Sequence, residues 1–141
     1  MHAELLIGTF ERQLDPKGRL ALPSEMRKVL GERCYLVRGT ARCVELVPAE
    51  DFERQVRELI DAVRSGDKDM SERRAVAGSA SLVVLDKQGR ITVDEKLRTY
   101  AGLSTGDPVV VAGNFDRAEI WAVDRHQRID AAGTERLAGD E

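Results

Sequence analysis

The stretch DPKGRLAL at residues 15–22 returns as DKQGRITV at residues 86–93, so that an Asp-x-x-Gly-Arg pattern occurs twice in 141 residues. The similarity continues beyond the pattern: EMR at 25–27 matches KLR at 96–98, Gly31 matches Gly102, and, after a three-residue insertion, ELV at 45–47 matches EIW at 119–121. A duplication this close predicts two copies of one structural unit around an internal pseudo-two-fold. The two arginine-bearing loops should then lie side by side.

Each copy begins with a strand, a tight turn and a second strand. In residues 5–22, Leu20 and Leu22 alternate with Arg19 and Ala21, which is the period of a strand. Pro16 presets φ at the first loop position and Gly18 can adopt a positive φ, which is typical of a three-residue hairpin loop.

A short helix and a second strand pair complete each copy. We expect helices over 24–30 and 94–101, because Gly31 and Gly102 can end them. The strand pairs are expected at 35–37 with 44–47 and at 109–112 with 119–122. A ββαββ unit of this size rarely buries enough apolar surface to stand alone. The sequence therefore predicts an α+β fold in which two units interlock into one small pseudo-two-fold β-barrel.

The segment between the copies reads as helical. Phe52, Val56, Leu59, Ile60 and Val63 form one apolar stripe of a helix over about 49–64. This stripe either covers the barrel or meets a neighbouring subunit. After a polar break, Ser71 can cap a second helix, and a last weak helix is expected from near Asp124.

Composition favours a cytoplasmic protein without a membrane span. No apolar run approaches the roughly 20 residues of a transmembrane helix, and the first residues lack the features of a secretory signal. The net charge is −3, and residues 129–141 alone carry −3, so the other residues balance at 21 basic and 21 acidic. A neutral body can still present a basic face. The acidic end is expected to be a solvated, frayed terminus.

The cysteines and histidines do not suggest a metal site. Cys34 and Cys43 are expected to be reduced and partly buried, and His2 and His126 lie far from both in sequence. We therefore expect structural or incidental roles for all four residues, and neither a metal nor another cofactor.

The paired loops and the ββαββ repeats resemble the MraZ family of bacterial transcriptional regulators, in which two SpoVT/AbrB-like half-domains lie in one chain. The resemblance extends over roughly Leu5 to His126. It implies a swapped-hairpin, AbrB-like barrel with the first half-domain at 5–52, inter-repeat helices at 53–80, the second half-domain at 81–126, and a C-terminal helix with an acidic tail at 127–141. It further implies a ring oligomer, nucleoid association and binding to repeated boxes of double-stranded DNA upstream of the division and cell-wall gene cluster. Similar proteins act chiefly on their own operon, often as repressors.

The residues of the two loops suggest a division of roles. Each aspartate can bond the loop amides and pair with the arginine, so Asp15, Gly18, Asp86 and Gly89 are expected to structure the loops. An arginine can donate to guanine O6 and N7, and a lysine to phosphate. The candidate DNA-binding residues are Arg19, Lys17, Arg90, Lys87, Arg12 and Arg27. Gln88 replaces Lys17 and Asp94 replaces Pro23 in the second copy, so its loop is expected to be the weaker contact.

Two other functional classes are compared with this sequence. An enzyme is not expected, because neither loop pairs two carboxylates, supplies a nucleophile context or matches a phosphate-cradling loop, and no small-molecule substrate is implied. An antitoxin-like protein-interaction module without operator-specific DNA binding is the alternative. Its partner-capturing tail should be apolar or amphipathic, which the polar stretch after Ile129 does not match well.

Overall fold

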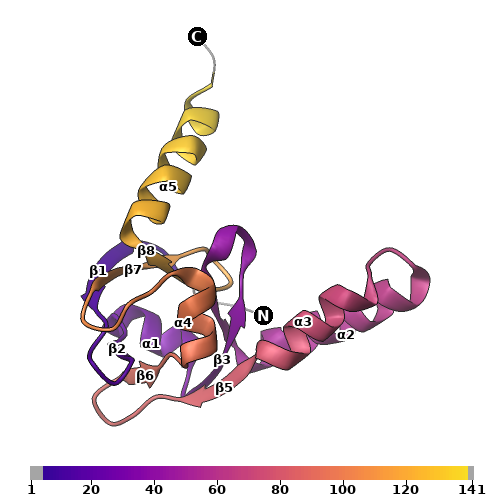
Figure 1. Cartoon of the computed structure of the whole chain (residues 1–141), viewed down its shortest axis with the longest axis horizontal. Helices are drawn as coiled ribbons and strands as arrows, with labels where there is room; N and C mark the ends of the chain where they lie inside the picture. Colours follow the sequence, from indigo (N-terminus) through magenta and orange to yellow (C-terminus); the bar gives the residue numbers. More distant parts are fainter. Residues whose placement is uncertain (1–4, 140–141) are drawn as a thin grey trace.

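The computed structural model describes residues 5–139, so His2, Asp140 and Glu141 lie outside the described residues (Figure 1). The first repeat contains β1 (Thr9–Gln13), β2 (Arg19–Ala21), α1 (Ser24–Leu30), β3 (Arg33–Arg38), a 3₁₀ turn (Thr40–Arg42) and β4 (Val44–Pro48). Helices α2 (Ala49–Ser65) and α3 (Met70–Ser79) follow it. The second repeat contains β5 (Ser81–Val84), β6 (Arg90–Thr92), α4 (Glu95–Ala101), β7 (Pro108–Gly113) and β8 (Ala118–Ala122), and α5 (Val123–Ala138) ends the chain.

The strands are exchanged between the two repeats. A six-stranded antiparallel sheet has the order β1-β7-β8-β4-β3-β5, and β2 pairs with β6 in a separate ribbon. Thus β1 pairs with β7 of the second repeat, and β5 pairs with β3 of the first. The first two strands of each repeat are joined by a tight loop but do not pair with each other, in contrast to a simple hairpin.

A pseudo-two-fold axis relates the repeats. The sheet order reads the same from either end when each strand is exchanged for its counterpart in the other repeat. Leu20 on β2 faces its own counterpart Ile91 on β6, and Glu45 on β4 faces its counterpart Glu119 on β8. The axis therefore passes midway between Leu20 and Ile91 and midway between Glu45 and Glu119, and the two loops flank it.

The α+β class and the antiparallel pairing agree with the sequence-based prediction, but barrel closure is not confirmed. Among the described residues, β1 and β5 are the outer strands of an open sheet. The β2–β6 ribbon packs Leu20 and Ile91 into the core beneath this sheet.

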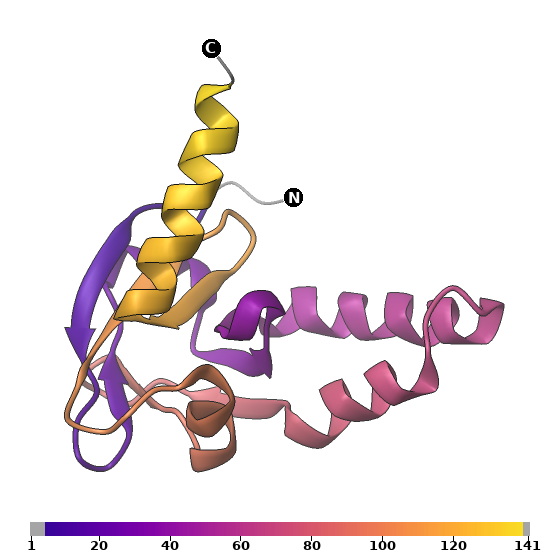
Figure 2. The ribbon, with the colours of Figure 1, turned by 45° about the horizontal axis from the view of Figure 1, so that its top comes forward.

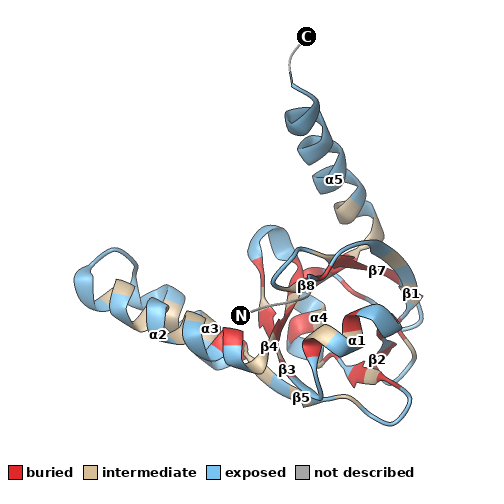
Figure 3. Ribbon diagram, turned by 180° about the vertical axis from the view of Figure 1, so that it is seen from behind, coloured by how far each residue is buried: buried red, intermediate tan, exposed pale blue. Residues whose placement is uncertain are grey.

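The core is aliphatic, as the scarcity of aromatic residues suggests. It unites Leu14, Leu20, Leu36, Ile91 and Ile120, drawn from both repeats. Cys34 and Cys43 are free and fully buried, so both are more deeply buried than expected. Figure 3 shows the buried residues concentrated in the body and largely absent from α5 and the outer part of α2.

Helices α2 and α3 form an arm that extends away from the body (Figure 2). Phe52 is buried against Tyr35, Val37 and Val47, but Leu59 farther along the stripe is only half-buried. Of the two alternatives for the stripe, packing against the sheet is therefore observed for the first turns of α2, beyond which the helix packs along α3. Helix α3 begins at Met70, so Asp69 rather than Ser71 occupies its N-cap position.

The acidic end is helical, and α5 rises from the end of the body opposite the two loops (Figure 1). This corrects the expectation of a frayed terminus for residues up to Ala138. No helix within residues 5–139 is long and apolar enough to cross a membrane.

Candidate nucleic-acid interface

The aspartate of each loop organises the loop around its carboxylate. Asp15 Oδ1 accepts hydrogen bonds from the amides of Lys17 at 2.9 Å and Arg19 at 2.8 Å, while Oδ2 accepts from Arg19 Nε at 2.7 Å. In the second loop, Asp86 Oδ1 accepts from the amides of Gln88 at 2.9 Å and Arg90 at 2.8 Å, and Oδ2 accepts from Arg90 Nε at 2.9 Å. One carboxylate thus fixes both the backbone and the arginine side chain of its loop.

The glycine of each loop supplies the turn. Gly18 has φ +80° and Gly89 has φ +77°, in the left-handed region that favours glycine. Each glycine amide donates to the carbonyl of the loop aspartate at 2.9 Å. These are the hydrogen bond and conformation of a tight three-residue loop.

The loop hydrogen bonds stabilise the ionised aspartates. The amide of Arg19 is the main cause that lowers the pKa of Asp15, partial desolvation opposes it, and the Arg19 side chain lowers it further. The pKa of Asp86 is lowered in the same way by Arg90. Both loops therefore hold a charged carboxylate against a charged guanidinium at neutral pH.

Arg19 and Arg90 lie on one face of the β2–β6 ribbon. Arg19 is paired with Thr92 and Arg90 with Ala21, while Leu20 and Ile91 point to the opposite, buried face. The side chains of Arg19 and Arg90 are 35% and 30% exposed. Within the described chain, neither arginine uses its Nη atoms in a hydrogen bond. Two guanidinium groups are therefore presented from the same outward face.

The remaining candidate cations have different surroundings. Lys17 and Lys87 are exposed at the loop tips. Arg12 on β1 is half-buried, lies over the ring of Phe10 with its Cζ 5.5 Å from the centroid, and donates to the carbonyl of Glu11. The structure thus groups the loop-tip lysines with Arg19 and Arg90 and gives Arg12 a local packing role.

Arg27 and its counterpart Arg98 each lie against the opposite loop. A Cβ added at Gly89 would lie 2.7 Å from Arg27 Cδ, and one added at Gly18 would clash with Arg98 Nη1. Arg98 Nη1 also donates to the carbonyl of Val93 at 2.6 Å. The sequence predicted a DNA contact for Arg27, and the structure places its side chain against the second loop, as Arg98 lies against the first. The matching of EMR with KLR was the available signal that they share one role.

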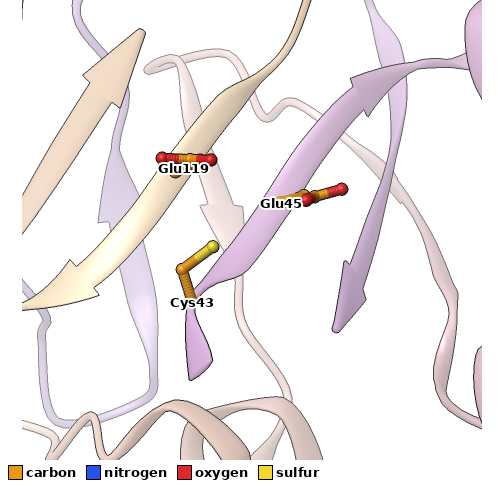
Figure 4. Close-up of side chains that lie close together, drawn as sticks. All are labelled: Cys43, Glu45 and Glu119. Atoms are coloured by element: carbon orange, nitrogen blue, oxygen red, sulfur yellow. The ribbon is translucent and has the colours of Figure 1, made fainter. Parts of the chain in front are cut away.

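Cys43, Glu45 and Glu119 come together near the pseudo-two-fold axis (Figure 4), with possible ligand atoms within 4.8 Å of one another. The carboxylates are already engaged: Arg117 Nη1 donates to Glu45 at 2.8 Å, and Trp121 Nε1 donates to Glu119 at 3.0 Å. Burial raises the pKa of the Cys43 thiol, and both glutamates raise it further, which disfavours the thiolate that a metal requires. The cluster is therefore a partly buried polar network. The sequence did not indicate this grouping, because Cys43 and Glu45 lie at β4 while Glu119 lies on β8 of the other repeat.

Comparison with known proteins identifies relatives over most of the chain. A family model described as the MraZ protein, with a suggested likeness to antitoxins, matches residues 5–74 and again residues 76–136. The chain is 42% identical to the transcriptional regulator MraZ of Bifidobacterium longum over 121 residues, which is 85% of this chain and 79% of that protein. It is 42% identical to the protein of that name from Kocuria rhizophila over 83% of this chain and 80% of the relative. For the Cutibacterium acnes protein of that name, the identity is 34% over 95% of this chain and 93% of the relative.

Proposed function

The chain belongs to the MraZ family, and from this membership we propose that it is a transcriptional regulator that binds double-stranded DNA through the loops at 15–19 and 86–90. The observation that carries the proposal is the presentation of Arg19 and Arg90 from one outward face, each steered by its aspartate. The relatives are named as transcriptional regulators.

The loop geometry suits base recognition. Because Asp15 occupies only Nε of Arg19, both Nη atoms can donate to guanine O6 and N7 in the major groove. Lys17 and Lys87 at the exposed tips supply charge for phosphates. Arg12 and Arg27 contribute less to binding, since their side chains are partly engaged in packing. The second loop, with Gln88 where the first has Lys17, makes the weaker contact.

We further propose that the protein acts as a ring oligomer on repeated boxes upstream of its own operon in the division and cell-wall gene cluster. A good bidentate arginine–guanine contact gives only about 1–3 kcal/mol of discrimination, so one subunit would select its site poorly. Several linked subunits on repeated boxes gain affinity through effective concentration. The projecting α2–α3 arm and the exposed apolar residues Leu82 and Val84 on edge strand β5 offer surface for contacts between subunits.

Footprinting of the purified full-length protein on the DNA upstream of its own gene tests this function. Protection of regularly spaced boxes supports it, and uniform or absent protection contradicts it. A salt series adds a second criterion, because the logarithm of the binding constant should fall by about 0.9 per phosphate contact for each tenfold rise in salt.

An antitoxin-like interaction module is the second candidate, and the description of the family model favours keeping it. In this case the exposed side chains of Ile129 and Leu137 on α5 would contact a protein partner. Binding through buried apolar surface should respond far less to salt than binding to phosphates. The salt series therefore separates the two candidates.

A further inference from the structure

Each arginine-bearing loop is held by the other repeat. The amide of Val93, which follows β6, donates to the carbonyl of Gly18 at 2.8 Å, and the amide of Leu22, which follows β2, donates to the carbonyl of Gly89 at 3.1 Å. These two hydrogen bonds are equivalent under the pseudo-two-fold. Neither loop is therefore a free-standing turn of its own repeat.

The arginines of α4 and α1 complete this crossed arrangement. Arg98 lies against Gly18 and also donates to the carbonyl of Val93, so one guanidinium touches both partners of the hydrogen bond that joins the repeats. Arg27 lies against Gly89 in the equivalent position. Both side chains are only partly exposed, and Arg27 Nε is buried without a hydrogen-bond partner in the described chain. Burial of this kind suits a packing role better than a contact with solvent-borne phosphate.

We propose that Arg98 and Arg27 are positioning residues for DNA binding, and that each sets the conformation of the loop in the opposite repeat. This inference rests on the proposed function for its effect on DNA and on the geometry alone for its effect on the loops. The missing side chain at Gly18 and Gly89 makes room for the arginines, in addition to permitting the positive φ. Because Arg98 Nη1 has a hydrogen bond, whereas Arg27 Nε is buried without one among the described residues, the first loop is the more firmly held.

Amide hydrogen exchange on the full chain tests the crossed effect without DNA. Arg98→Ala should speed exchange at Gly18 and Val93 by about tenfold or more, while Leu22 and Gly89 keep their rates, because local opening is confined to the part that loses its support. Arg27→Ala should show the reverse pattern. Lys96→Ala is the matched control, since it removes a positive charge from α4 through an exposed side chain. The amides of Val44 and Leu46 in the core report any general loss of stability.

Measurement of DNA binding is the second part of the experiment. Arg98→Ala should weaken operator binding at least about fivefold yet leave the salt slope unchanged, whereas loss of a phosphate contact lowers the slope by about 0.9. Arg98→Lys keeps the charge but not the planar fork, so it should restore little of the lost affinity. The proposal would be overturned if amide exchange rates did not change or if both loops loosened equally. It would also be overturned if the salt slope of DNA binding fell, or if Arg98→Lys restored the full DNA affinity. If the wild-type protein does not bind its upstream DNA, the proposed function fails, and the exchange pattern still decides whether the arginines hold the loops.

Discussion

Glu45 on β4 lies directly opposite Glu119 on β8, and the two glutamates are each other's counterparts in the two repeats. Like charges directly opposite one another across a ladder are destabilising. Arg117 offsets the charge of Glu45, while Asn114 Nδ2 and Trp121 Nε1 each donate to Glu119 at 3.0 Å. Burial raises the pKa of Glu45, Arg117 opposes this, and Glu119 raises it further. The internal symmetry thus places a costly pair of carboxylates on its own axis.

Replacement of Glu45 by glutamine should stabilise the fold at neutral pH. The pKa of Glu45 is raised in the folded state, so protonation of Glu45 adds to the free energy of unfolding. This stabilisation is fully present below the pKa of the unfolded chain, about 4.3, and is lost as the pH rises through the pKa of the folded protein. Glu45→Gln should therefore increase the free energy of unfolding at pH 7 by up to about 1 kcal/mol and show no gain at pH 4. Urea unfolding at both pH values measures this, with the exposed Glu11→Gln as control. A less stable variant at pH 7 would mean that the pair with Arg117 outweighs the repulsion.

Asp15 should control the shape of the first loop in two ways, because Oδ1 accepts from the loop amides and Oδ2 accepts from the Arg19 side chain. Asp15→Asn keeps an acceptor for the amides of Lys17 and Arg19 but loses the ion pair, whereas Asp15→Ala loses both. DNA affinity should therefore fall in the order wild type, asparagine, alanine, as measured by fluorescence anisotropy. Equal DNA affinities for all three proteins would contradict a role of Asp15 in shaping the DNA-binding loop.

The loops should loosen only in strong acid. Since the pKa of Asp15 and that of Asp86 are lowered, their contribution to stability is present above the unfolded value of about 3.9 and is lost as the pH falls through the folded value. NMR shifts of the Arg19 and Arg90 amides should therefore titrate below pH 3.9. A transition above that pH would contradict the hydrogen-bonded geometry of the loops.

The β2–β6 ribbon should be sensitive to truncation at its centre. Leu20 and Ile91 are both buried and face each other at the axis. Leu20→Ala should cost about 2–5 kcal/mol of unfolding free energy, and Ile91→Ala a similar amount because it leaves the equivalent cavity. Ile7→Ala, at an exposed isoleucine, is the matched control and should be nearly neutral. Chemical denaturation gives all three values, and a small effect at Leu20 would contradict the packing of the ribbon.

Both thiols should be inert in the folded protein. Burial raises the pKa of Cys34 to about 11 and also raises that of Cys43, and alkylation requires the thiolate. Iodoacetamide at pH 8 should therefore modify neither residue in native protein and both in urea, as read by mass spectrometry. Rapid native labelling of either cysteine would show that its part of the core opens readily.

Local features were predictable because local residues cause them. The spacing of Asp15, Gly18 and Arg19 predicts a tight loop from local hydrogen bonds, and the glycines at 31 and 102 follow the helices as expected. The difference between Pro23 and Asp94 also has a local reason, since Asp94 caps α4 by accepting from the amide of Leu97.

Features that depend on the whole molecule were not predictable. The sequence predicts that the two repeats interlock, but it does not show that β1 pairs with β7, because that pairing depends on burial shared by both repeats around the axis. The apolar stripe of α2 predicts an amphipathic helix, but the spacing of its residues does not identify the surface that they contact. The projecting arm was therefore not predicted. The crossed placement of Arg27 and Arg98 required the same three-dimensional symmetry.

The most direct test of the account is a gel-shift series with Arg19→Ala on DNA upstream of the gene, run beside light scattering and with Arg90→Ala for comparison. Because a bidentate contact contributes about 1–3 kcal/mol and would be repeated in every subunit of the proposed ring, Arg19→Ala should abolish the specific shift while the mass measured by light scattering stays the same. Arg90→Ala should weaken the shift less. An unchanged specific shift with Arg19→Ala would contradict the central claim that these loops recognise DNA.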